Sequence, residues 1–489
     1  MVSLRSTLAW LLLVGVLATP VPAAAQPEAP SRPNIVVVMT DDQRWNLFGS
    51  MPTVRRELKA RGLSLTRAVA SSPLCCPSRA SFLAGTYPHT NGVWSNGAEG
   101  VPGGWGAFRP LEDDTLATWL DAAGYQTGLF GKYLNQYNDP TAIPPGWDRW
   151  VAFTGRNGAY FDYDLAVDGR AVRFADAPDD YSTDVLGGYV ESFIRTSDPG
   201  EPLFVYFAPF APHGPATPAP RHASADVNAP FPRHDGVNER NVSDKPEWIR
   251  DVPRLDDARM DRLHDRAERE TRALMAVDEA IARILTAMRE TDRTDTLYVL
   301  VADQGIAWGE HRWTYKGDPY EPSIREALVL RWDGHITPGV RSRALVQNVD
   351  VAPTLAQVAG VATAAVDGSS FTSLFDGDGG FRPYTTTEYT GLIRERKPTP
   401  PTYCVIREPR FKYIRYGTRE EELYGLDRDP HEVRNLLAAR LRGREPRRAY
   451  ARLSDIADQE CRWMRGGVSD PPRPAFARAA DGRPGAAVA

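Results

Sequence analysis

Three segments of continuous apolar residues predict strands of a parallel sheet. Residues 34–39 (N-I-V-V-V-M), 203–208 (L-F-V-Y-F-A) and 297–302 (L-Y-V-L-V-A) lack the alternation of apolar and polar side chains that marks a half-exposed strand. A strand needs apolar side chains at nearly every position when helices cover both faces of its sheet. These segments are therefore predicted to form the buried centre of such a sheet.

A helical pattern precedes the third segment. Apolar residues recur there at intervals of three and four, which places them on one face of a helix: Leu274, Val277, Ile281, Ile284, Leu285 and Met288. A helix followed by a buried strand is typical of α/β architecture with right-handed crossover connections. The expected fold class is therefore α/β.

Polar residues follow each predicted strand directly. Asp41 and Asp42 follow the first strand, His213 comes shortly after the second, and Asp303 and Gln304 follow the third. Parallel strands end at the same edge of a sheet, and open α/β sheets bind ligands at this edge. We therefore expect these side chains, distant in sequence, to converge.

Changes in composition indicate loops and a boundary. Residues 96–112 and 209–260 are rich in Gly, Pro and polar residues, which predicts long surface loops. Near residues 375–402 the composition shifts to Gly, Pro and Thr, as it does at domain boundaries.

The sequence predicts a large domain and a smaller one. We expect a catalytic domain over residues 31–375 and a C-terminal subdomain over residues 385–466. The subdomain contains short strand-like segments at 403–407 and 411–416, followed by a helical pattern. Residues 467–489 are dominated by Pro, Ala, Arg and Gly and are expected to be disordered.

The N-terminus has the features of a signal peptide. Arg5 precedes a short apolar run, and Ala23-Ala24-Ala25 fits a cleavage site, so residues 1–25 are expected to be removed. An uncleaved anchor is the alternative. No later segment is long and apolar enough to span a membrane. A secreted or periplasmic protein is therefore expected, with no membrane contact after cleavage.

Composition and charge limit the possible partners. The 489 residues are 42% hydrophobic and 25% charged, as in ordinary globular proteins, and the formal net charge is -5. A nucleic-acid partner is not expected, because a binding protein of that kind would carry a basic stripe. An anionic small molecule is compatible with this charge, since a local cluster of cations can attract it.

The four cysteines divide into two groups. Cys404 and Cys461 are a plausible disulfide pair in an exported protein. Cys75 and Cys76 are adjacent, and adjacent cysteines rarely bridge each other because the geometry is strained. An unpaired pair in an oxidising compartment requires a chemical reason.

The acidic residues at two strand ends indicate a metal site. Asp41 and Asp42 repel each other unless a cation lies between them, and hard oxygen ligands suit Ca²⁺ or Mg²⁺. A helix N-cap is the competing interpretation of this pair, because Asp is favoured there. Asp303 and Gln304 add a carboxylate and an amide oxygen, which together make an all-oxygen site.

The segment around Cys75 is the most specific motif in the chain. It reads L-C-C-P-S-R-A-S-F-L-A-G from Leu74, and only Cys75 has the spacing C-x-P-S-R. This motif resembles the signature of the sulfatase family, in which the cysteine is oxidised to formylglycine. A buried structural cysteine pair is the alternative interpretation.

The resemblance to sulfatases extends over nearly the whole mature chain. Residues 34–43 resemble the family's first strand and metal pair, residues 124–132 its second signature, and residues 211–215 its histidine segment. Residues 303–325 resemble the second metal segment with its distal lysine, and residues 421–436 the C-terminal motif.

This resemblance implies the fold and the chemistry. The implied fold is that of the alkaline-phosphatase-like superfamily: a large mixed, mostly parallel sheet sandwiched by helices, with a smaller C-terminal α+β subdomain. The implied activity is hydrolysis of sulfate monoesters by a formylglycine made from Cys75 by a maturation enzyme. The implied Ca²⁺ ligands are Asp41, Asp42, Cys75, Asp303 and Gln304, and the implied catalytic residues are Cys75, Arg79, Lys132, His213 and Lys316. Arg79 is expected to hold the formylglycine hydrate, and His311 either lies near the site or only supports it.

Within the family, the chain most resembles the group of glucosamine-6-sulfatases and extracellular heparan sulfatases. G-K-Y-L-N-Q-Y-N at 131–138 and I-P-P-G-W at 143–147 carry this likeness. Many sulfatases have His where this chain has Leu134, although the amino-sugar group also has Leu. The second metal segment usually carries Asn or His where this chain has Gln304, whose longer side chain puts its role as a ligand in doubt.

The substrate and two alternative functions stay open from the sequence. A sulfated amino sugar is the expected substrate, and an aromatic stretch could form its binding surface or belong to the core: Trp147, Trp150, Tyr160, Phe161 and Tyr163. A phosphomonoester or phosphonate hydrolase of the same superfamily is the first alternative. A sugar-binding pseudo-sulfatase is the second, although a binding protein would not need Cys75.

Overall fold

The three predicted central strands lie side by side. The computed structural model describes residues 32–155, 158–377, 379–391 and 398–466. In it, β1 (Asn34–Thr40) pairs in parallel with β8 (Leu203–Ala208) on one side and with β9 (Thr296–Ala302) on the other. Every residue of β1 is buried, as its unbroken apolar pattern predicts.

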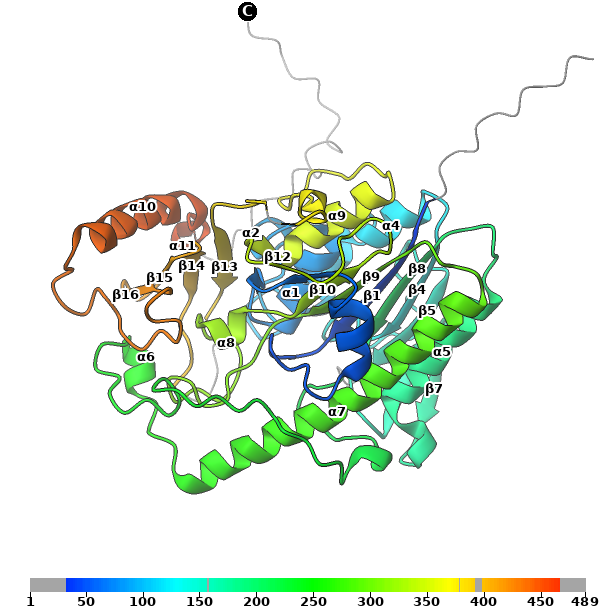
Figure 1. The fold of residues 1–489 in the computed structure, drawn as a ribbon, viewed down its shortest axis with the longest axis horizontal. Coiled ribbons are helices and arrows are strands. Elements are labelled where there is room, and N and C mark those ends of the chain that lie inside the picture. The colour runs from blue at the N-terminus through cyan, green and yellow to red at the C-terminus, as the bar shows by residue number, and fades with distance from the viewer. Residues whose placement is uncertain (1–31, 156–157, 378, 392–397, 467–489) are drawn as a thin grey trace, which may run out of the picture. The chain divides into compact units, whose positions relative to one another are not determined.

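A large mixed sheet surrounds these strands. Among the described residues it contains ten strands, in the order β11-β2-β10-β9-β1-β8-β4-β5-β6-β7 (Figure 1). The strands from β9 to β5 in this order are mutually parallel, whereas β10, β6 and β7 introduce antiparallel pairs towards the two margins. The other strands are β2 (Leu63–Leu65), β4 (Gln126–Gly131), β5 (Arg149–Thr154), β6 (Tyr163–Val167), β7 (Arg170–Phe174), β10 (Leu328–Arg331) and β11 (Val340–Ser342).

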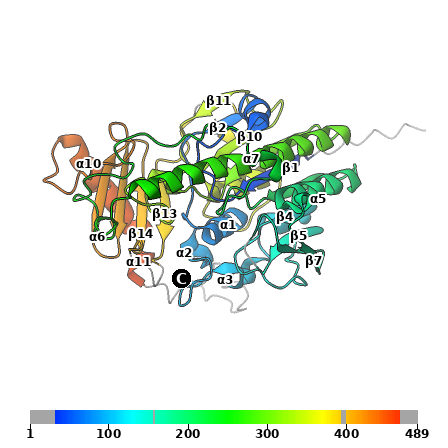
Figure 2. The same ribbon diagram turned by 90° about the horizontal axis from the view of Figure 1, so that it is seen from below.

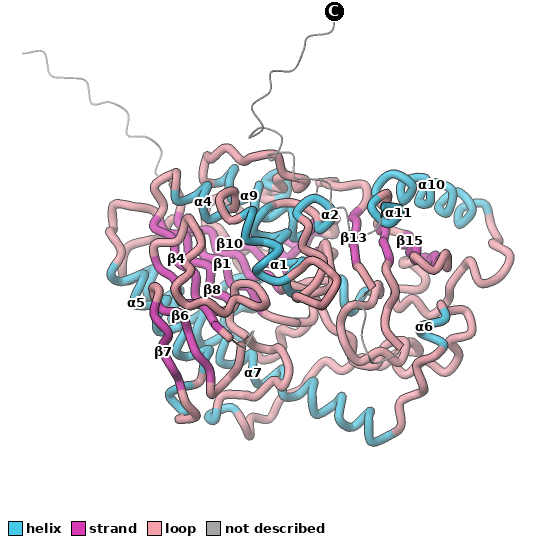
Figure 3. Tube along the Cα trace, turned by 180° about the vertical axis from the view of Figure 1, so that it is seen from behind, coloured by secondary structure: helices cyan, strands magenta, loops and turns pink. Residues whose placement is uncertain are grey.

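Helices cover both faces of this sheet. Ile35, Val37 and Met39 of β1 belong to one hydrophobic core, and Val36 and Val38 belong to the other, because successive side chains of a strand point to opposite faces. The first core includes α1 (Cys75–Ala84), α4 (Leu116–Asp121) and α9 (Val351–Val358), which Figure 3 shows from behind. The second includes α5 (Ser182–Thr196) and the long α7 (Asp257–Glu290), which carries the predicted apolar stripe.

A smaller antiparallel sheet follows in the chain. Its strands are β13 (Thr385–Tyr389), β14 (Tyr403–Arg407), β15 (Phe411–Tyr416) and β16 (Glu421–Gly425). Alternate residues of β14 belong to two cores: Tyr403 and Val405 pack towards Val69 and Leu74, and Cys404 and Ile406 pack with α10 (Arg444–Glu460). This sheet and its helix, labelled in Figure 2, confirm the expected C-terminal α+β arrangement.

A disulfide closes the C-terminal region. Cys404 of β14 is bonded to Cys461, directly after α10, with the Cα atoms 6.0 Å apart. Cys75 and Cys76 are buried and unbridged. The described residues from Pro33 onward form one compact unit that contains both sheets, so the domain boundary between residues 375 and 385 stays a prediction.

Two predicted loops contain more structure than their composition indicates. Residues 96–112 include α3 (Gly104–Phe108) and η2 (Arg109–Leu111), and residues 209–260 include η4 (Pro220–His222), α6 (Glu247–Arg250) and the beginning of α7. These short helices are stabilised by buried side chains such as Trp105 and Trp248 rather than by their own propensity. The remaining elements are η1 (Val54–Lys59), β3 (Ala68–Val69), α2 (Pro88–Asn91), η3 (Pro178–Asp180), α8 (Glu321–Ile324), β12 (Val346–Gln347), η5 (Asn348–Asp350), η6 (Thr372–Leu374) and α11 (Trp463–Gly466).

Both ends of the chain lie outside the described residues. The signal peptide expected over residues 1–25 and the disordered tail expected over 467–489 therefore stay predictions. Within the described part, no helix is both long enough and apolar enough to cross a bilayer.

Candidate active site

The carboxyl ends of four neighbouring strands supply most of the expected site residues. Asp41 and Asp42 directly follow β1, Lys132 directly follows β4, and Asp303 directly follows β9. His213 comes five residues after β8. These strands are adjacent and parallel, so their ends meet at one edge, where ligands of open α/β sheets bind.

The remaining site residues reach this edge from a helix and a loop. Cys75 is the first residue of α1, so the positive end of the helix dipole is near its thiol. Arg79 lies one turn further along α1, and Lys316 belongs to the loop between β9 and α8. We refer to the whole set as the strand-end cluster: Asp41, Asp42, Cys75, Arg79, Lys132, His213, Asp303, Gln304 and Lys316.

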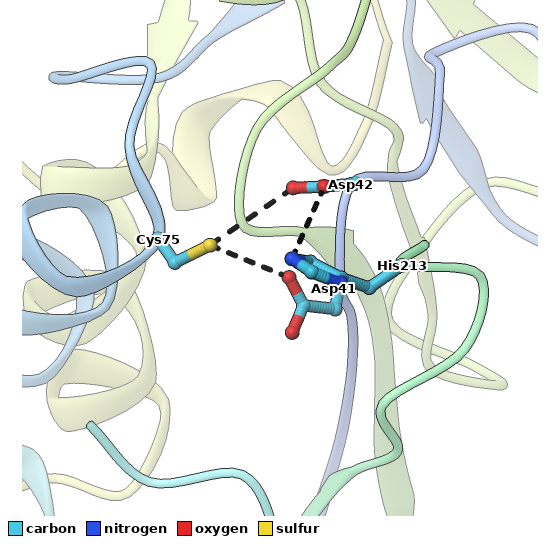
Figure 4. Close-up of side chains that lie close together, drawn as sticks. All are labelled: Asp41, Asp42, Cys75 and His213. Carbon is cyan, nitrogen blue, oxygen red and sulfur yellow. Dashed lines mark hydrogen bonds and ion pairs between the residues drawn. The ribbon is translucent and has the colours of Figure 1, made fainter. Parts of the chain in front are cut away.

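The thiol of Cys75 lies among charged groups (Figure 4). Its Sγ is 3.5 Å from Asp41 Oδ1 and 3.9 Å from Asp42 Oδ1. Lys316 Nζ lies 2.7 Å from the same sulfur and donates a hydrogen bond to Asp42 Oδ1 at 2.6 Å. Lys132 Nζ donates to Asp41. The predicted nucleophile is therefore placed between two carboxylates and a lysine.

The backbone of Asp42 is held in a left-handed conformation. Its φ angle is 64°, which costs a residue other than Gly about 1 kcal/mol or more. The backbone N–H of Asp42 donates to Asp303 Oδ1 at 2.9 Å, which helps to hold this conformation. Neither Asp41 nor Asp42 caps a helix, because the next helix after β1 is η1. The N-cap interpretation of the acidic pair is therefore wrong.

Arg79 joins three parts of the cluster while being completely buried. Its Nε donates to Asp303 Oδ2 at 2.9 Å and its Nη1 to the backbone carbonyl of Lys132 at 2.9 Å. Its Nη2 lies 3.6 Å from Asp41 Oδ2. The guanidinium thereby ties the ends of β1, β4 and β9 to α1.

Burial and crowding shift the pKa values in the cluster. Burial, together with the charge of Asp41, raises the pKa of the Cys75 thiol to about 12. The same two causes raise the pKa of Asp303 to about 6. Burial would also raise the pKa of Asp41, but the cations led by Lys132 outweigh it and hold that pKa well below its usual range. Asp41 is therefore ionised at neutral pH, while the unmodified thiol is protonated.

Several of these residues could hold a metal ion. Asp41, Asp42, Cys75 and His213 each offer one ligand atom, and these atoms lie within 4.8 Å of one another. The amide of Gln304 contacts Asp42 Oδ1 and lies 3.6 Å from Cys75 Sγ, while its Oε1 is buried without a hydrogen-bond partner. A divalent cation would accept such an oxygen as a ligand and would offset the repulsion between the carboxylates. The donor set fits a hard cation.

His213 presents one ring nitrogen to the cluster. Its Nδ1 lies 2.8 Å from the backbone carbonyl of Gly214, and its Nε2 lies 3.6 Å from Asp42 Oδ2. Burial lowers the pKa of His213, so the ring is neutral at pH 7 and donates its Nδ1 proton to Gly214. The Tyr160 hydroxyl donates to the backbone carbonyl of His213 at 2.7 Å and supports this segment.

The aromatic stretch expected as a sugar surface belongs to the core. Trp150, Tyr160 and Tyr163 are at most 3% exposed, and all three are members of the two main cores. Trp147 and Phe161 pack against those cores from their margins. Of the two interpretations of this stretch, the core interpretation describes the structure.

The structure also adds residues that the sequence did not indicate. Asn348 Nδ2 donates to the backbone carbonyl and the hydroxyl of Ser78, at 3.0 and 2.8 Å, and Ser78 in turn bonds to the carbonyl of Asp303. Ser78 is part of the C-x-P-S-R motif and could have been assigned this structural role, whereas Asn348 has no local signal. His311 bonds to Glu239 at 2.7 Å and packs on Tyr320, and none of its contacts involves the cluster.

Models of known families match most of the chain. The model described as Sulfatase matches residues 33–361. A second model, described as N-sulphoglucosamine sulphohydrolase, C-terminal, matches residues 309–452. The first match contains every residue of the strand-end cluster, and the second covers the antiparallel sheet.

Curated relatives of this chain include named sulfatases. An N-acetylglucosamine-6-sulfatase of Capra hircus is 30% identical over 449 residues, which cover 83% of this chain and 80% of that protein. An extracellular sulfatase SULF-1 homolog of Drosophila melanogaster is 31% identical over 357 residues, covering 70% of this chain and 31% of that protein.

Among solved structures, a protein in complex with its substrate D-glucosamine-2-N,6-O-disulfate has a TM-score of 0.74 at 24% identity, covering 90% of this chain and 99% of that one. The phosphonate monoester hydrolase of Agrobacterium radiobacter has a TM-score of 0.68 at 20% identity, covering 89% and 96%. At these identities the two structures share the fold.

Proposed function

The chain belongs to the sulfatase family and is a sulfuric ester hydrolase, and we propose that it removes sulfate from a sulfated amino sugar by means of a formylglycine at Cys75. The observation that carries this proposal is the position of Cys75, at the start of α1 and between Asp41, Asp42 and Lys316. No other cysteine of the chain combines this setting with the C-x-P-S-R spacing.

The unmodified thiol is poorly suited to the reaction. Burial and Asp41 raise the pKa of Cys75 to about 12, so almost no thiolate exists at neutral pH. A formylglycine hydrate would supply one hydroxyl as the nucleophile on sulfur and a second hydroxyl whose deprotonation releases sulfate. This requirement explains why a cysteine would be kept in so unreactive an environment, and it implies a maturation enzyme as a partner.

Asp41, Asp42, Asp303 and Gln304 would hold the divalent cation, together with the modified Cys75. When bound, such a cation lowers the pKa of a hydroxyl and draws charge from the sulfate oxygens. The hard oxygen donors favour Ca²⁺ or Mg²⁺ over transition metals, and we propose Ca²⁺.

The cations of the cluster would stabilise the transferring sulfuryl group. Asp42 and the neighbouring carboxylates raise the pKa of Lys316 although burial opposes this, so its amine stays charged. The side chains of Lys316 and His213 are 15% and 30% exposed, which leaves them the most accessible members of the cluster that form ion pairs. We assign both to the leaving-group side, where the charged amine of Lys316 would bind the bridging oxygen and return a proton to it, with the Nε2 of neutral His213 beside it. Lys132 and Arg79 would hold the sulfate and the hydrate from the buried side.

The proposed substrate is a glucosamine unit with a 6-O-sulfate. The relatives named N-acetylglucosamine-6-sulfatase and the segment at 131–138 support this choice.

The extracellular sulfatase relatives and the N-terminal sequence support secretion. The second candidate is a phosphonate or phosphate monoester hydrolase, which the shared fold of a phosphonate monoester hydrolase favours.

The mass of the peptide that contains Cys75 tests the mechanism, in protein produced with a formylglycine-generating enzyme. We expect an aldehyde or its hydrate at Cys75 and an unmodified thiol at Cys76. Cys75→Ala should abolish turnover, and the matched Cys76→Ala variant should retain most of it. An unmodified Cys75 thiol in fully active enzyme would overturn the proposed chemistry.

Relative rates test the substrate. We expect kcat/KM for glucosamine-6-sulfate to exceed that for 4-nitrophenyl sulfate, 4-nitrophenyl phosphate and a phosphonate monoester. A preference of more than about tenfold, or about 1.4 kcal/mol, for the aryl sulfate would contradict the sugar assignment alone. The same preference for a phosphorus ester would replace the whole proposal by the second candidate.

A further inference from the structure

A second concentration of positive charge lies away from the strand-end cluster. A cavity of about 460 Å³ lies between one margin of the main sheet and the antiparallel sheet, and five arginines line it: Arg67, Arg325, Arg341, Arg343 and Arg407. They come from the β2–β3 turn, the end of α8, β11 and the residue after it, and the end of β14. None of the cavity's lining residues belongs to the strand-end cluster. We call it the arginine pocket.

The arginine pocket contains one carboxylate, Glu321, and this group is already engaged. Glu321 accepts two hydrogen bonds from Arg407, at 2.9 and 3.0 Å, and lies 3.5 Å from Lys412 Nζ. Arg325 lies 3.7 Å from the same carboxylate. The carboxylate of Glu321 is therefore shared among three cations, of which Lys412 also forms an ion pair with Glu432.

The other arginines of the pocket pair with no carboxylate in the described part of the chain. Among the described residues, none lies within ion-pair distance of Arg67, Arg341 or Arg343. Burial and the like charges of Arg343 and Arg407 lower the pKa of Arg67, although Asp427 and Glu321 act against them. Burial, with Arg407 and Arg67 adding to it against Glu321, lowers the pKa of Arg325 to about 10. A bound anion would relieve this repulsion.

Two of the guanidinium groups are preorganised donors. Arg407 is 3% exposed, and its Nη1 is buried without a hydrogen-bond partner. The Nε of Arg325 is also buried and has no hydrogen-bond partner, although it faces Glu321 at 3.7 Å, while its Nη2 donates to the backbone carbonyl of Thr66 at 2.5 Å. The Arg325 guanidinium stacks on the ring of Trp45, 3.7 Å from the centroid. Fixed planar donors of this kind match the geometry of sulfate and carboxylate oxygens.

We propose that the arginine pocket binds sulfate or carboxylate groups of a polyanionic saccharide, at a site separate from the strand-end cluster. The pocket's five arginines and single carboxylate leave four positive charges, which is more than one small anion would neutralise. A saccharide that carries several anionic groups would match this charge. The half-buried Trp45, with Arg325 on one ring face, and the hydroxyl of Thr66, which donates to the carbonyl of Ser342 and keeps an acceptor lone pair, add apolar and polar surface that a sugar ring can use. The choice of a saccharide as the ligand rests on the proposed function, whereas the anion site does not.

This pocket would anchor long substrates. A saccharide that occupies both sites at once gains affinity from the second contact without any change at the reacting bond. Loss of the pocket should therefore raise KM for sulfated oligosaccharides and leave kcat/KM for a sulfated monosaccharide unchanged.

The test uses direct binding to the full chain. Isothermal titration calorimetry at low ionic strength would measure the affinity for a fully sulfated heparin hexasaccharide, in a Cys75→Ala background so that the probe is not consumed. The test variant is R67Q/R343Q, which removes two unpaired charges without touching the Arg407–Glu321 pair. The matched control is R259Q/R262Q on the exposed side of α7, which removes the same charge elsewhere. Free sulfate and a single-stranded DNA of equal charge serve as competing probes.

We expect the dissociation constant for the hexasaccharide to rise about tenfold in R67Q/R343Q and less than about twofold in the control, since binding through unpaired charges depends on their number. Equal affinities in the two variants would overturn the proposal. Competition by free sulfate as strong as that by the hexasaccharide would show that the pocket is a small-anion site and would overturn the saccharide assignment. An affinity for the single-stranded DNA equal to that for the hexasaccharide would also overturn the saccharide assignment. These binding measurements do not depend on turnover. If the enzyme hydrolysed no sulfated sugar, the proposed function would be contradicted, but the binding experiment would still test the arginine pocket.

Discussion

The strand-end cluster and a second buried group of charges resemble each other electrostatically but differ in access. The second group, which we call the boundary network, consists of Glu321, Arg407, Lys412 and Glu432, where β14 and β15 meet α8. Arg407 binds Glu321 through two hydrogen bonds, and Lys412 Nζ forms an ion pair with Glu432 and donates to the carbonyl of Pro319 at 3.0 Å. In each group, buried carboxylates and cations form ion pairs with one another.

Both groups contain strongly shifted carboxylates. In the boundary network, burial raises the pKa of Glu432 to about 7 against the charge of Lys412, and in the strand-end cluster burial and Asp41 raise the pKa of Asp303 to about 6. The side chains of Lys412 and Glu432 are at most 1% exposed, whereas those of His213 and Lys316 are 30% and 15% exposed.

A shifted pKa alone therefore does not identify an active site, because tightly buried ion pairs shift pKa values as well. The strand-end cluster differs by having accessible members that form ion pairs and a nucleophile-bearing residue.

The largest expected difference between the two groups is catalytic. Asp42→Asn should lower kcat/KM by about 10³-fold or more, since it removes a proposed metal ligand and a partner of Lys316. Asn tolerates the left-handed backbone of this position, so the free energy of unfolding should change by less than about 1 kcal/mol. Steady-state kinetics and chemical denaturation would measure the two effects. A variant that loses stability and activity together would place Asp42 with the structural charges.

The boundary network should show the opposite behaviour. Lys412→Met leaves Glu432 and Glu321 buried with less positive charge, which should lower the free energy of unfolding by about 3–5 kcal/mol. The folded fraction should keep its kcat within about twofold. Lys59→Met is the matched control: Lys59 is half-buried and, among the described residues, has no carboxylate within ion-pair distance, so we expect a loss below about 1 kcal/mol. A large fall in kcat at full stability for Lys412→Met would show that the network acts in catalysis.

The disulfide in the same region should contribute to stability alone. Cys404 and Cys461 are 57 residues apart, and a crosslink over such a loop stabilises by about 2–4 kcal/mol, mainly through the unfolded state. Replacing both residues by Ala should lower the free energy of unfolding by this amount and leave the activity of the folded protein intact. If a reductant does not lower the melting temperature of the unaltered protein, the disulfide does not have this role.

Gln304 provides a finer test of the strand-end cluster. Removal of divalent metal by a chelator should abolish activity, and Ca²⁺ should restore it. Gln304→Ala should raise the Ca²⁺ concentration required for half-maximal activity by about tenfold, or about 1.4 kcal/mol. Gln304→Asn should keep or improve the affinity, because Asn carries the same amide on a side chain that is one methylene shorter. An unchanged Ca²⁺ requirement and rate in Gln304→Ala would remove Gln304 from the ligand set.

The smallest expected effect concerns the pH dependence of stability. His89 Nδ1 lies beside the buried carboxylate of Glu388 on β13. Burial would lower the pKa of His89, but Glu388 outweighs it and raises this pKa to about 9. Because this value lies above the unfolded pKa of about 6.5, the stabilisation is complete below pH about 6.5 and is lost as the pH rises through about 9.

His89→Gln should therefore flatten the fall in melting temperature between pH 6.5 and 9 while leaving kcat/KM unchanged. The exposed His335, which stacks on Trp332, offers a control variant, His335→Gln, that should keep the original slope. Identical slopes in all three proteins would assign the pH dependence to other groups.

Local sequence patterns were sufficient for the central elements. The apolar runs at 34–39, 203–208 and 297–302 lie within β1, β8 and β9, because a strand with helices on both faces has no position for a polar side chain. The C-x-P-S-R motif and the polar residues after the strands identified Cys75, Arg79 and the acidic groups, since parallel strands end at a common edge. The short helices within 96–112 and 209–260 were missed because tertiary packing, and not propensity, stabilises them.

What the sequence by itself determined, then, is the fold class, the family and the members of the strand-end cluster. The acidic residues, Gln304 and His213 follow from the regular geometry of a parallel sheet, whereas Lys132 and Lys316 follow from the resemblance to sulfatases. Only the tertiary structure decided which charges are paired and which are left over. Asn348 supports Ser78 across 270 positions, and the arginine pocket gathers its five arginines from four separate segments. Pairing of this kind depends on distances of a few ångströms between distant segments, and no pattern along the chain encodes those distances.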